Sequence, residues 1–322
     1  MYKRKKLKLK EPFSKTYQHH GYQTGILLAH INCIEYLYSQ YVQVFYSIKD
    51  KKMEYDHSFF FSDDQAFIQY FCTFPMEYVS NGDIIECIKD FIKQDKYVYG
   101  NWNEYHISLK KRFHQYNFLH NFLIYGFDDE KEVFLAVGYI HTGFWQEYEV
   151  TYREACDALY DENNHNVNLQ CFDVNRYFNK SFEYDLFKTK LNQYYNSTEV
   201  YNNFEPGPCI GGLNAWHEFI VNECERMKLK EIGKKESYFL FSEYKELMIN
   251  RLEYFRRQGG YDINLDWISG YTKLLYESKR TLNLVLKFNM QRDITLIDRI
   301  YNAVEYNIES ERSLLEKVLV SI

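Results

Sequence analysis

The sequence contains little proline and glycine, with 4 Pro and 14 Gly in 322 residues. Few positions therefore interrupt regular secondary structure, and no low-complexity segment rich in these residues occurs. Long apolar runs are missing too, because no window reaches the roughly 18 apolar residues that a membrane-spanning helix needs. Together with a mean hydropathy of -0.53, this absence excludes a multi-span membrane protein.

An excess of positive charge is also missing, since 39 Lys and Arg face 45 Asp and Glu and the net charge is -6. Such a chain is not a non-specific nucleic-acid binder. Basic residues do gather between Lys3 and Lys10, but no apolar run of a secretory signal follows them. We expect an edge strand or tail kept in solvent by its lysines. Docking of an acidic partner is the alternative.

Motifs for metals and nucleotides are absent. The seven cysteines form no CxxC pair, which argues against a zinc knuckle and against a disulfide framework. His19, His20 and His30 lack a second ligand cluster with zinc-like spacing, so we expect no metal site. Neither a P-loop nor a GxGxxG motif occurs, which argues against the common nucleotide-binding folds. An odd number of thiols fits a reducing compartment, and we expect a soluble cytoplasmic protein.

Aromatic residues are abundant. The 32 Tyr and 25 Phe contribute most of an aromatic content of 19%, within a hydrophobic content of 46%. This composition excludes a disordered chain. A chain of this length forms one large domain or two ordinary ones, with ample residues for a core. Much of that core should be aromatic.

Helical patterns occur in the first half of the chain. Apolar residues at helical spacing predict helices over 32–48 and 83–94, and Asn32 is the expected N-cap of the first. Thr151 is followed three residues later by Glu154, which is the spacing of a capping box. We therefore expect a short helix after Thr151.

The clearest strand pattern lies between these helices. Segments 118–127 and 132–140 are apolar and flank the polar turn 128–131, which predicts a β-hairpin. The aromatic-rich segment 97–105 is expected to be extended. Helices and strands therefore alternate irregularly, which favours an α+β fold.

The last third of the chain reads as helical throughout. The Pro/Gly cluster at 206–208 is the best boundary candidate, and we divide the chain into domains 1–204 and 205–322. Four amphipathic helices follow, and their apolar stripes indicate core packing in a helical bundle rather than a cofactor site. They are expected over 210–227, 237–258, 265–290 and 293–320.

One cysteine stands apart by its position. Cys33 is expected at the first helical residue after Asn32, where backbone N–H groups and the helix dipole stabilise a thiolate. A thiolate nucleophile needs a proton shuttle, and His120, which lies in an otherwise apolar strand, is the leading candidate. The alternative roles are a buried small hydrophobe and a core histidine. The remaining cysteines are expected to be inert: Cys72, Cys87, Cys156, Cys171, Cys209 and Cys224.

Three segments of the sequence resemble a known family. The region 105–139, with the YGFDD turn at Tyr125–Asp129, is similar to the histidine region of papain-like thiol acyltransferases of specialised metabolism. That family includes the butirosin-biosynthesis acyltransferase and the transacylating cysteine-protease homologue of closthioamide assembly. Residues 32–35 resemble the family's nucleophile segment. The helix around Arg251 resembles its C-terminal half.

The resemblance implies a papain-like cysteine-protease fold over 1–204 with an added helical region over 205–322. It implies that Cys33 takes an acyl chain from a carrier-protein thioester and passes it to a small amine, with His120 as general base, to form an amide. The protein itself would hold no cofactor, because the phosphopantetheine belongs to the carrier protein. A cysteine hydrolase or peptidase and an inactive scaffold of the same pathway are the alternatives.

The sequence departs from this family pattern in its supporting residues. Gly138 stands where the family's third catalytic residue, an Asp, is expected, and Asp128 and Glu147 are weak substitutes. The nearest glutamine upstream of the cysteine is Gln23, with Gln18 further away, as a donor for the oxyanion. Three basic residues before His120 form either a solvated face or a docking site for an acidic carrier protein. They are Lys110, Lys111 and Arg112.

Overall fold

The computed structural model describes residues 3–31, 33–56, 66–143, 145–160, 165–175, 181–198, 208–258 and 263–321. The chain is a mixed α+β protein with antiparallel sheets. It divides into two compact units, and each is built from two separate stretches of sequence. The first unit comprises Met1–Asn32 and Phe60–Asn179, and the second comprises Cys33–Phe59 and Lys180–Ile322. The predicted domain boundary at 204/205 lies outside the described residues.

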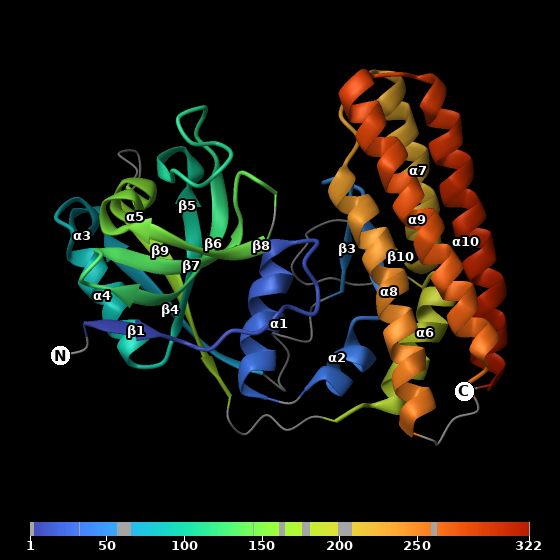
Figure 1. Cartoon of the computed structure of the whole chain (residues 1–322), viewed down its shortest axis with the longest axis horizontal. Coiled ribbons are helices and arrows are strands. Elements are labelled where there is room, and N and C mark those ends of the chain that lie inside the picture. Colours follow the sequence, from blue (N-terminus) through green and yellow to red (C-terminus); the bar gives the residue numbers. More distant parts are fainter. Residues whose placement is uncertain are drawn as a thin grey trace. The chain divides into compact units, whose positions relative to one another are not determined.

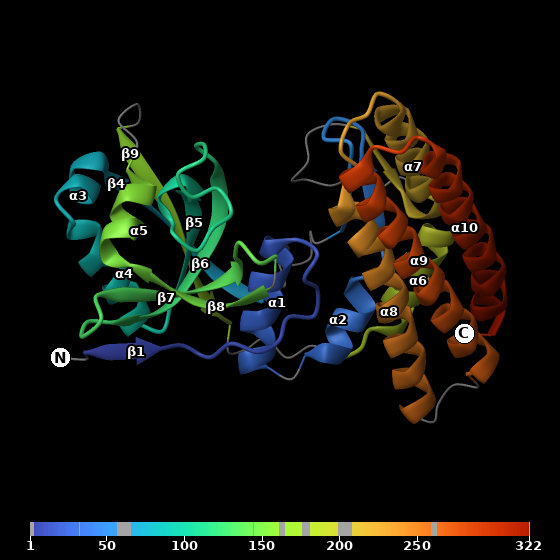
Figure 2. The same ribbon diagram turned by 45° about the horizontal axis from the view of Figure 1, so that its top comes forward.

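A seven-stranded antiparallel sheet forms the centre of the first unit (Figures 1 and 2). The two views show helix α1 at one side of this sheet and α3, α4 and α5 at the other. The strands are ordered β4 (Phe67–Pro75), β9 (Asn166–Val174), β5 (Tyr97–Asn103), β6 (Leu119–Asp128), β7 (Val133–Tyr139) and β8 (Trp145–Thr151), with β1 (Arg4–Lys6) paired to β6. The helices are α1 (Gln18–His30), α3 (Met76–Ser80), α4 (Asp83–Lys93) and α5 (Tyr152–Leu159).

Several local predictions in the first unit are confirmed. Strands β6 and β7 form the expected hairpin, the segment that begins at Tyr97 is a strand, and α4 occupies most of 83–94. The Thr151 side chain accepts a hydrogen bond from the Glu154 N–H at 3.1 Å and completes the predicted capping box. These elements follow from local pattern because each carries its own capping, turn or periodicity signal.

The predicted helix over 32–48 is correct only in its first half. Helix α2 (Ile34–Gln40) ends early, and the chain continues as strand β2 (Val44–Ser47). All four residues of β2 are buried, so the strand lacks the alternation of buried and exposed residues, and such a run can resemble a helix by its spacing. Strand β2 pairs with β3 (Lys52–Tyr55) and β10 (Cys209–Gly211).

Long helices form most of the second unit, and α7 to α10 run side by side (Figure 1). The four predicted C-terminal helices are confirmed to within about two residues at each end, whereas α6 was not predicted. Among the helices of the described residues, none is long and apolar enough to cross a membrane. Their bounds are α6 (Tyr184–Tyr195), α7 (Gly212–Lys228), α8 (Lys235–Gln258), α9 (Leu265–Gln291) and α10 (Thr295–Ser321).

Arg251 connects the stretch Cys33–Phe59, which contains α2, to the long helices of the second unit. Its side chain on α8 is fully buried. The guanidinium donates hydrogen bonds to the carbonyl oxygens of Tyr38, at 2.8 Å, and Tyr41. These carbonyls lie at the C-terminal end of α2, where backbone acceptors have no partner within the helix. Arg251 therefore supplies a positive charge at the end where the helix dipole favours one.

Candidate active site

His120 lies near the start of β6, opposite Trp102 of β5. Its side chain is 38% exposed, and its Nδ1 is 2.8 Å from Oε1 of Glu104. An ionised carboxylate only accepts hydrogen bonds, so Nδ1 carries the proton and Nε2 presents its lone pair. This arrangement fixes the tautomer that general-base catalysis needs.

Glu104 follows directly after β5, in the short 3-10 turn Glu104–His106. The Asn103 side chain caps this turn by accepting hydrogen bonds from the N–H groups of Tyr105, at 3.1 Å, and Phe118, at 3.0 Å. The Glu104 N–H donates to the Phe118 carbonyl at 2.9 Å. These bonds join the end of β5 to the start of β6 and bring the Glu104 carboxylate beside the His120 ring.

The Glu104 carboxylate has a second cationic neighbour, Lys110. The Lys110 Nζ lies 3.7 Å from Glu104 Oε1, and the two side chains are 1% and 8% exposed. Burial lowers the pKa of Lys110 to about 8, although Glu104 acts in the opposite direction. The expectation that Lys110 lies on a solvated or docking face is therefore wrong, because its ammonium is turned into the first unit. Lys111, the next residue, is exposed.

Gln18 is the first residue of α1 and contacts the His120 ring. Its amide nitrogen lies 3.1 Å from Nε2 and 3.2 Å from Nδ1 of His120. The same nitrogen donates to the Asn121 carbonyl at 3.2 Å, and its oxygen accepts from the Tyr139 N–H at 3.2 Å. The amide therefore joins β6 to the end of β7. The sequence favoured Gln23, but the glutamine at His120 is Gln18.

Gly138 carries no side chain because the space beside it is filled. A β-carbon there would lie 2.6 Å from Gln18 Oε1 and 2.8 Å from the Tyr22 hydroxyl, and the backbone has φ +142°. The carboxylate that reaches His120 is Glu104, not an acid on β7 and neither of the substitutes considered. Asp128 pairs with Arg4 at 3.5 Å, and Glu147 pairs with Lys6 at 2.7 Å.

Cys33 is the N-cap of α2, one position before its expected place, and its carbonyl accepts from the Leu37 N–H at 3.0 Å. The thiol is buried. The expected cap Asn32 lies outside the described residues. Cys33 begins the second unit and His120 belongs to the first, so the pairing of the two residues stays a prediction.

The other thiols differ from a catalytic cysteine in their surroundings. Burial raises the pKa of Cys171 and Cys224 to about 12 and the pKa of Cys156 to about 11. Burial and nearby carboxylates also raise the pKa of Cys87. A raised pKa leaves little thiolate at neutral pH, which agrees with the expected inertness of these four.

The histidines weighed as metal ligands lie at opposite ends of α1. His19 and His20 begin the helix and His30 ends it, a separation of roughly 15 Å along the axis. The His30 Nε2 is 2.7 Å from the Tyr97 hydroxyl. These three residues therefore do not make one ligand set.

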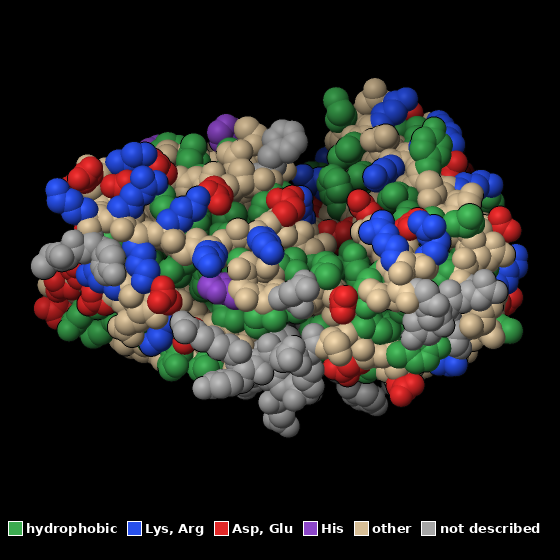
Figure 3. Space-filling view, turned by 60° about the horizontal axis from the view of Figure 1, so that its bottom comes forward, with side chains coloured by type: hydrophobic (Ala, Val, Ile, Leu, Met, Phe, Trp, Pro, Cys, Tyr) green, Lys and Arg blue, Asp and Glu red, His purple; other side chains and the backbone are tan. Residues whose placement is uncertain are grey.

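The basic N-terminal segment is partly an edge strand, as predicted, because Arg4–Lys6 forms β1. Four of its side chains pair with carboxylates of the same unit. Lys3 pairs with Glu130 at 3.4 Å and Lys5 with Asp95 at 2.9 Å. Arg4 pairs with Asp128 and Lys6 with Glu147. On the face shown in Figure 3, basic and acidic side chains are interspersed. These pairs account for four of the basic side chains of the segment.

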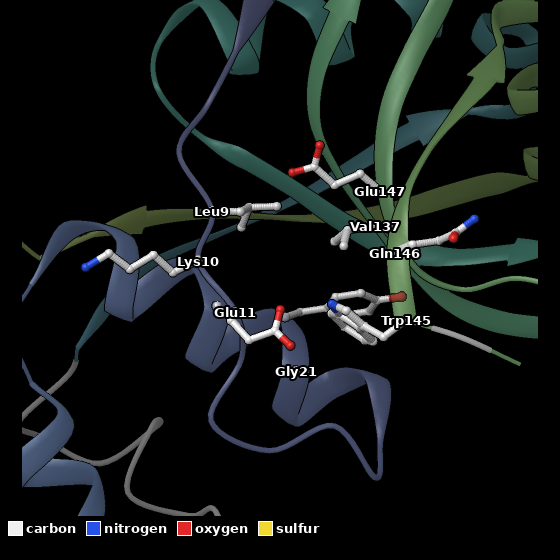
Figure 4. A pocket seen from close by; sticks show the side chains of 10 residues that line it. Leu9, Lys10, Glu11, Gly21, Val137, Trp145, Gln146 and Glu147 are labelled. Carbon is white, nitrogen blue, oxygen red and sulfur yellow. The ribbon is translucent and has the colours of Figure 1, made fainter.

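A small pocket lies elsewhere in the first unit (Figure 4), with a volume of about 170 Å³. Trp145 and Glu147 of β8 and Glu11 contribute to its lining. The Trp145 ring covers Gly21 so closely that a β-carbon there would lie 2.5 Å from it. Both carboxylates already pair with lysines, Glu147 with Lys6 and Glu11 with Lys15. His120 does not line this pocket.

No family model and no curated protein matches the sequence. The geometry around His120 and the motifs of the sequence are therefore the observations that bear on function.

Proposed function

We propose that the protein is a papain-like, thiol-dependent acyltransferase with Cys33 as nucleophile and His120 as general base. The observation that carries this proposal is the 2.8 Å contact between His120 Nδ1 and the nearly buried Glu104 carboxylate. A carboxylate in this position orients the imidazole and stabilises the imidazolium that forms when Nε2 accepts a proton. The family resemblance supplies the nucleophile and the substrate class.

The proposed reaction has two halves. In the first, His120 accepts the Cys33 proton, and the thiolate attacks the thioester carbonyl of an acyl chain on the phosphopantetheine of a carrier protein. The bond from the carbonyl carbon to the pantetheine sulfur breaks, and the imidazolium protonates the departing thiolate. In the second half, a small amine attacks the acyl-enzyme and His120 accepts its proton. The Cys33 thiolate leaves, and the product is an amide.

Gln18 supports the proposal as a donor to the oxyanion. Its amide group has two N–H bonds, and one donates to the Asn121 carbonyl. The second is close to the His120 ring nitrogens, where the reacting carbonyl would have to lie. Donors fixed in this way stabilise negative charge in the transition state and not in the ground state.

The test is intact-protein mass spectrometry after incubation with an acyl-pantetheine thioester. We expect one acyl adduct on the wild type that disappears when an amine is added, and none on Cys33→Ala. Cys87→Ala is the matched control, because this half-buried cysteine on α4 should leave the adduct unchanged. An adduct that persists on Cys33→Ala would contradict the proposal. Acid product instead of amide in the presence of amine would indicate the hydrolase.

A catalytically inactive binding protein is a second candidate, and the position of Gln18 favours it. The amide nitrogen 3.1 Å from Nε2 occupies the lone pair that a general base would use. In that case Cys33 reacts slowly with iodoacetamide and Gln18→Ala changes no reactivity. For the acyltransferase, we expect Gln18→Ala to lower the rate of acylation by roughly 10²-fold or more.

A further inference from the structure

Lys110 is enclosed by three different parts of the first unit. Its Nζ donates a hydrogen bond to the Tyr139 carbonyl of β7 at 2.7 Å. It lies 4.9 Å from the centre of the Tyr148 ring of β8 and 3.7 Å from Glu104 Oε1. The side chain is 1% exposed, so this ammonium has exchanged water for one carbonyl, one ring face and one carboxylate.

A buried ammonium is costly unless it is paired, and so is a buried carboxylate. Lys110 and His120 both face the same oxygen of Glu104, Oε1. Glu104 therefore lies between the Lys110 ammonium and a ring that becomes a cation during the proposed reaction. The lysine offsets the cost of burying Glu104 and opposes movement of the carboxylate away from Nδ1.

We infer that Lys110 is a positioning residue, which holds the Glu104 carboxylate against His120 and limits how strongly that carboxylate favours the imidazolium. This inference rests on the proposed function for its catalytic meaning. Its physical content concerns only the side chains of the first unit. A carboxylate without Lys110 would draw a proton onto His120, and the ring would be protonated at a higher pH.

The same geometry makes the arrangement sensitive to pH. Burial lowers the pKa of Lys110 to about 8, so its charge is lost in mildly alkaline solution. Among the residues that the structure describes, His120, Tyr148 from β8 and Tyr22 from α1 also interact with Glu104. Burial raises the pKa of both tyrosines well above its usual value, so they remain neutral over this range. A shift of the His120 NMR resonances near pH 8 would therefore indicate that Lys110 loses its proton there.

The test is NMR titration of the His120 ring in the full chain, with ¹⁵N-labelled histidine to assign the tautomer. In the wild type we expect the Nδ1–H tautomer and a second small shift of the His120 resonances near pH 8. Lys110→Met should move the titration midpoint of His120 upward by roughly one pH unit. Lys111→Met, at the exposed neighbouring position, is the matched control and should leave it in place.

Two outcomes would overturn the inference. One is a His120 midpoint and tautomer in Lys110→Met that equal those of the wild type. The other is a wild-type titration without a second shift between pH 7 and 10, which needs no variant and decides the question even if Lys110→Met does not fold.

The readout does not require turnover, so it separates this inference from the proposed function. If the His120 titration differs between the wild type and Lys110→Met but Cys33 forms no adduct, the positioning role is supported and the acyltransferase is refuted. A Cys33 adduct on a protein whose His120 titration is the same in the wild type and in Lys110→Met would support the acyltransferase and refute the positioning role.

Discussion

The side-chain oxygen of Gln18 occupies the space that a side chain at Gly138 would need. A β-carbon at Gly138 would lie 2.6 Å from this oxygen, which accepts a hydrogen bond from the Tyr139 N–H. An aspartate at position 138 would therefore require the Gln18 side chain to move. The carboxylate at His120 comes instead from Glu104, at the end of the strand on the other side of β6.

We predict that Gly138→Ala destabilises the first unit by about 2–4 kcal/mol, because the new methyl group meets Gln18 and Tyr22 and the backbone is strained. Gly143→Ala is the matched control. Gly143 also has a positive φ, +80°, but open space lies around its β-carbon position, so we expect a cost of only about 1 kcal/mol. Urea unfolding measures both. Equal losses would show that Gln18 does not hold this space.

Glu104→Gln tests the orienting carboxylate. Gln keeps the size of the side chain but removes the charge and permits the other tautomer of His120. We expect the rate of Cys33 acylation to fall by roughly 10²–10⁴-fold, as for other catalytic histidines that lose their carboxylate. Glu147→Gln, which changes an acid paired with Lys6, should leave the rate within about twofold. Similar rates for the two variants would remove Glu104 from the site.

The stability of the protein should rise with pH where Lys110 loses its proton. The pKa of Lys110 is about 8 in the folded chain, below its ordinary value of 10.5. Between these values the unfolded chain binds more protons, so the free energy of unfolding increases with pH. The full effect is roughly 3 kcal/mol. Below pH 8 the buried ammonium contributes its full cost.

Comparison of the wild type with Lys110→Met isolates this term, since other groups that titrate are common to both proteins. We expect the free energy of unfolding of the wild type, relative to the variant, to grow between pH 7.5 and pH 10. The exposed Lys111 supplies the control, because Lys111→Met should track the wild type at every pH. A difference that is the same at both pH values would contradict the lowered pKa.

Much of the fold could be predicted from the sequence where a local signal is strong. The capping box of Thr151, the β6–β7 hairpin and the four long helices each carry such a signal in consecutive residues. Strand β2 does not, because a strand buried on both faces has no alternation of apolar and polar residues. It pairs both with β3, which is near in the sequence, and with β10, whose residues are far away.

The residues of the site also differ in whether a local sequence signal identifies them. His120 could be found as a polar residue in an apolar strand. Glu104 could not be found in this way, because its role depends on the register in which β5 pairs with β6, Trp102 opposite His120. The family pattern places the acid on β7, whereas Glu104 follows β5, the strand that pairs with the other edge of β6. Lys110 resembles Lys111 and Arg112 in sequence, and only the packed structure separates it from them.

The long helices contain a buried ion pair that allows a final prediction. Lys245 of α8 and Glu311 of α10 form a salt bridge in which both side chains are fully buried. The Tyr194 hydroxyl also donates to Glu311, at 3.0 Å. Burial lowers the pKa of Lys245, although Glu311 opposes this change. We expect Lys245→Met to destabilise the second unit by about 3–5 kcal/mol, because it leaves a carboxylate buried without its cation.

A second substitution should restore much of this loss. Gln at position 311 is neutral and still accepts the hydrogen bond from Tyr194, so Lys245→Met combined with Glu311→Gln leaves no buried charge at this pair. We expect the double variant to be more stable than Lys245→Met alone, and a double-mutant cycle by urea unfolding measures the coupling. If the two losses simply add, the charges are not paired in the folded protein. If both single variants are neutral, water reaches the pair and the burial of these side chains is refuted.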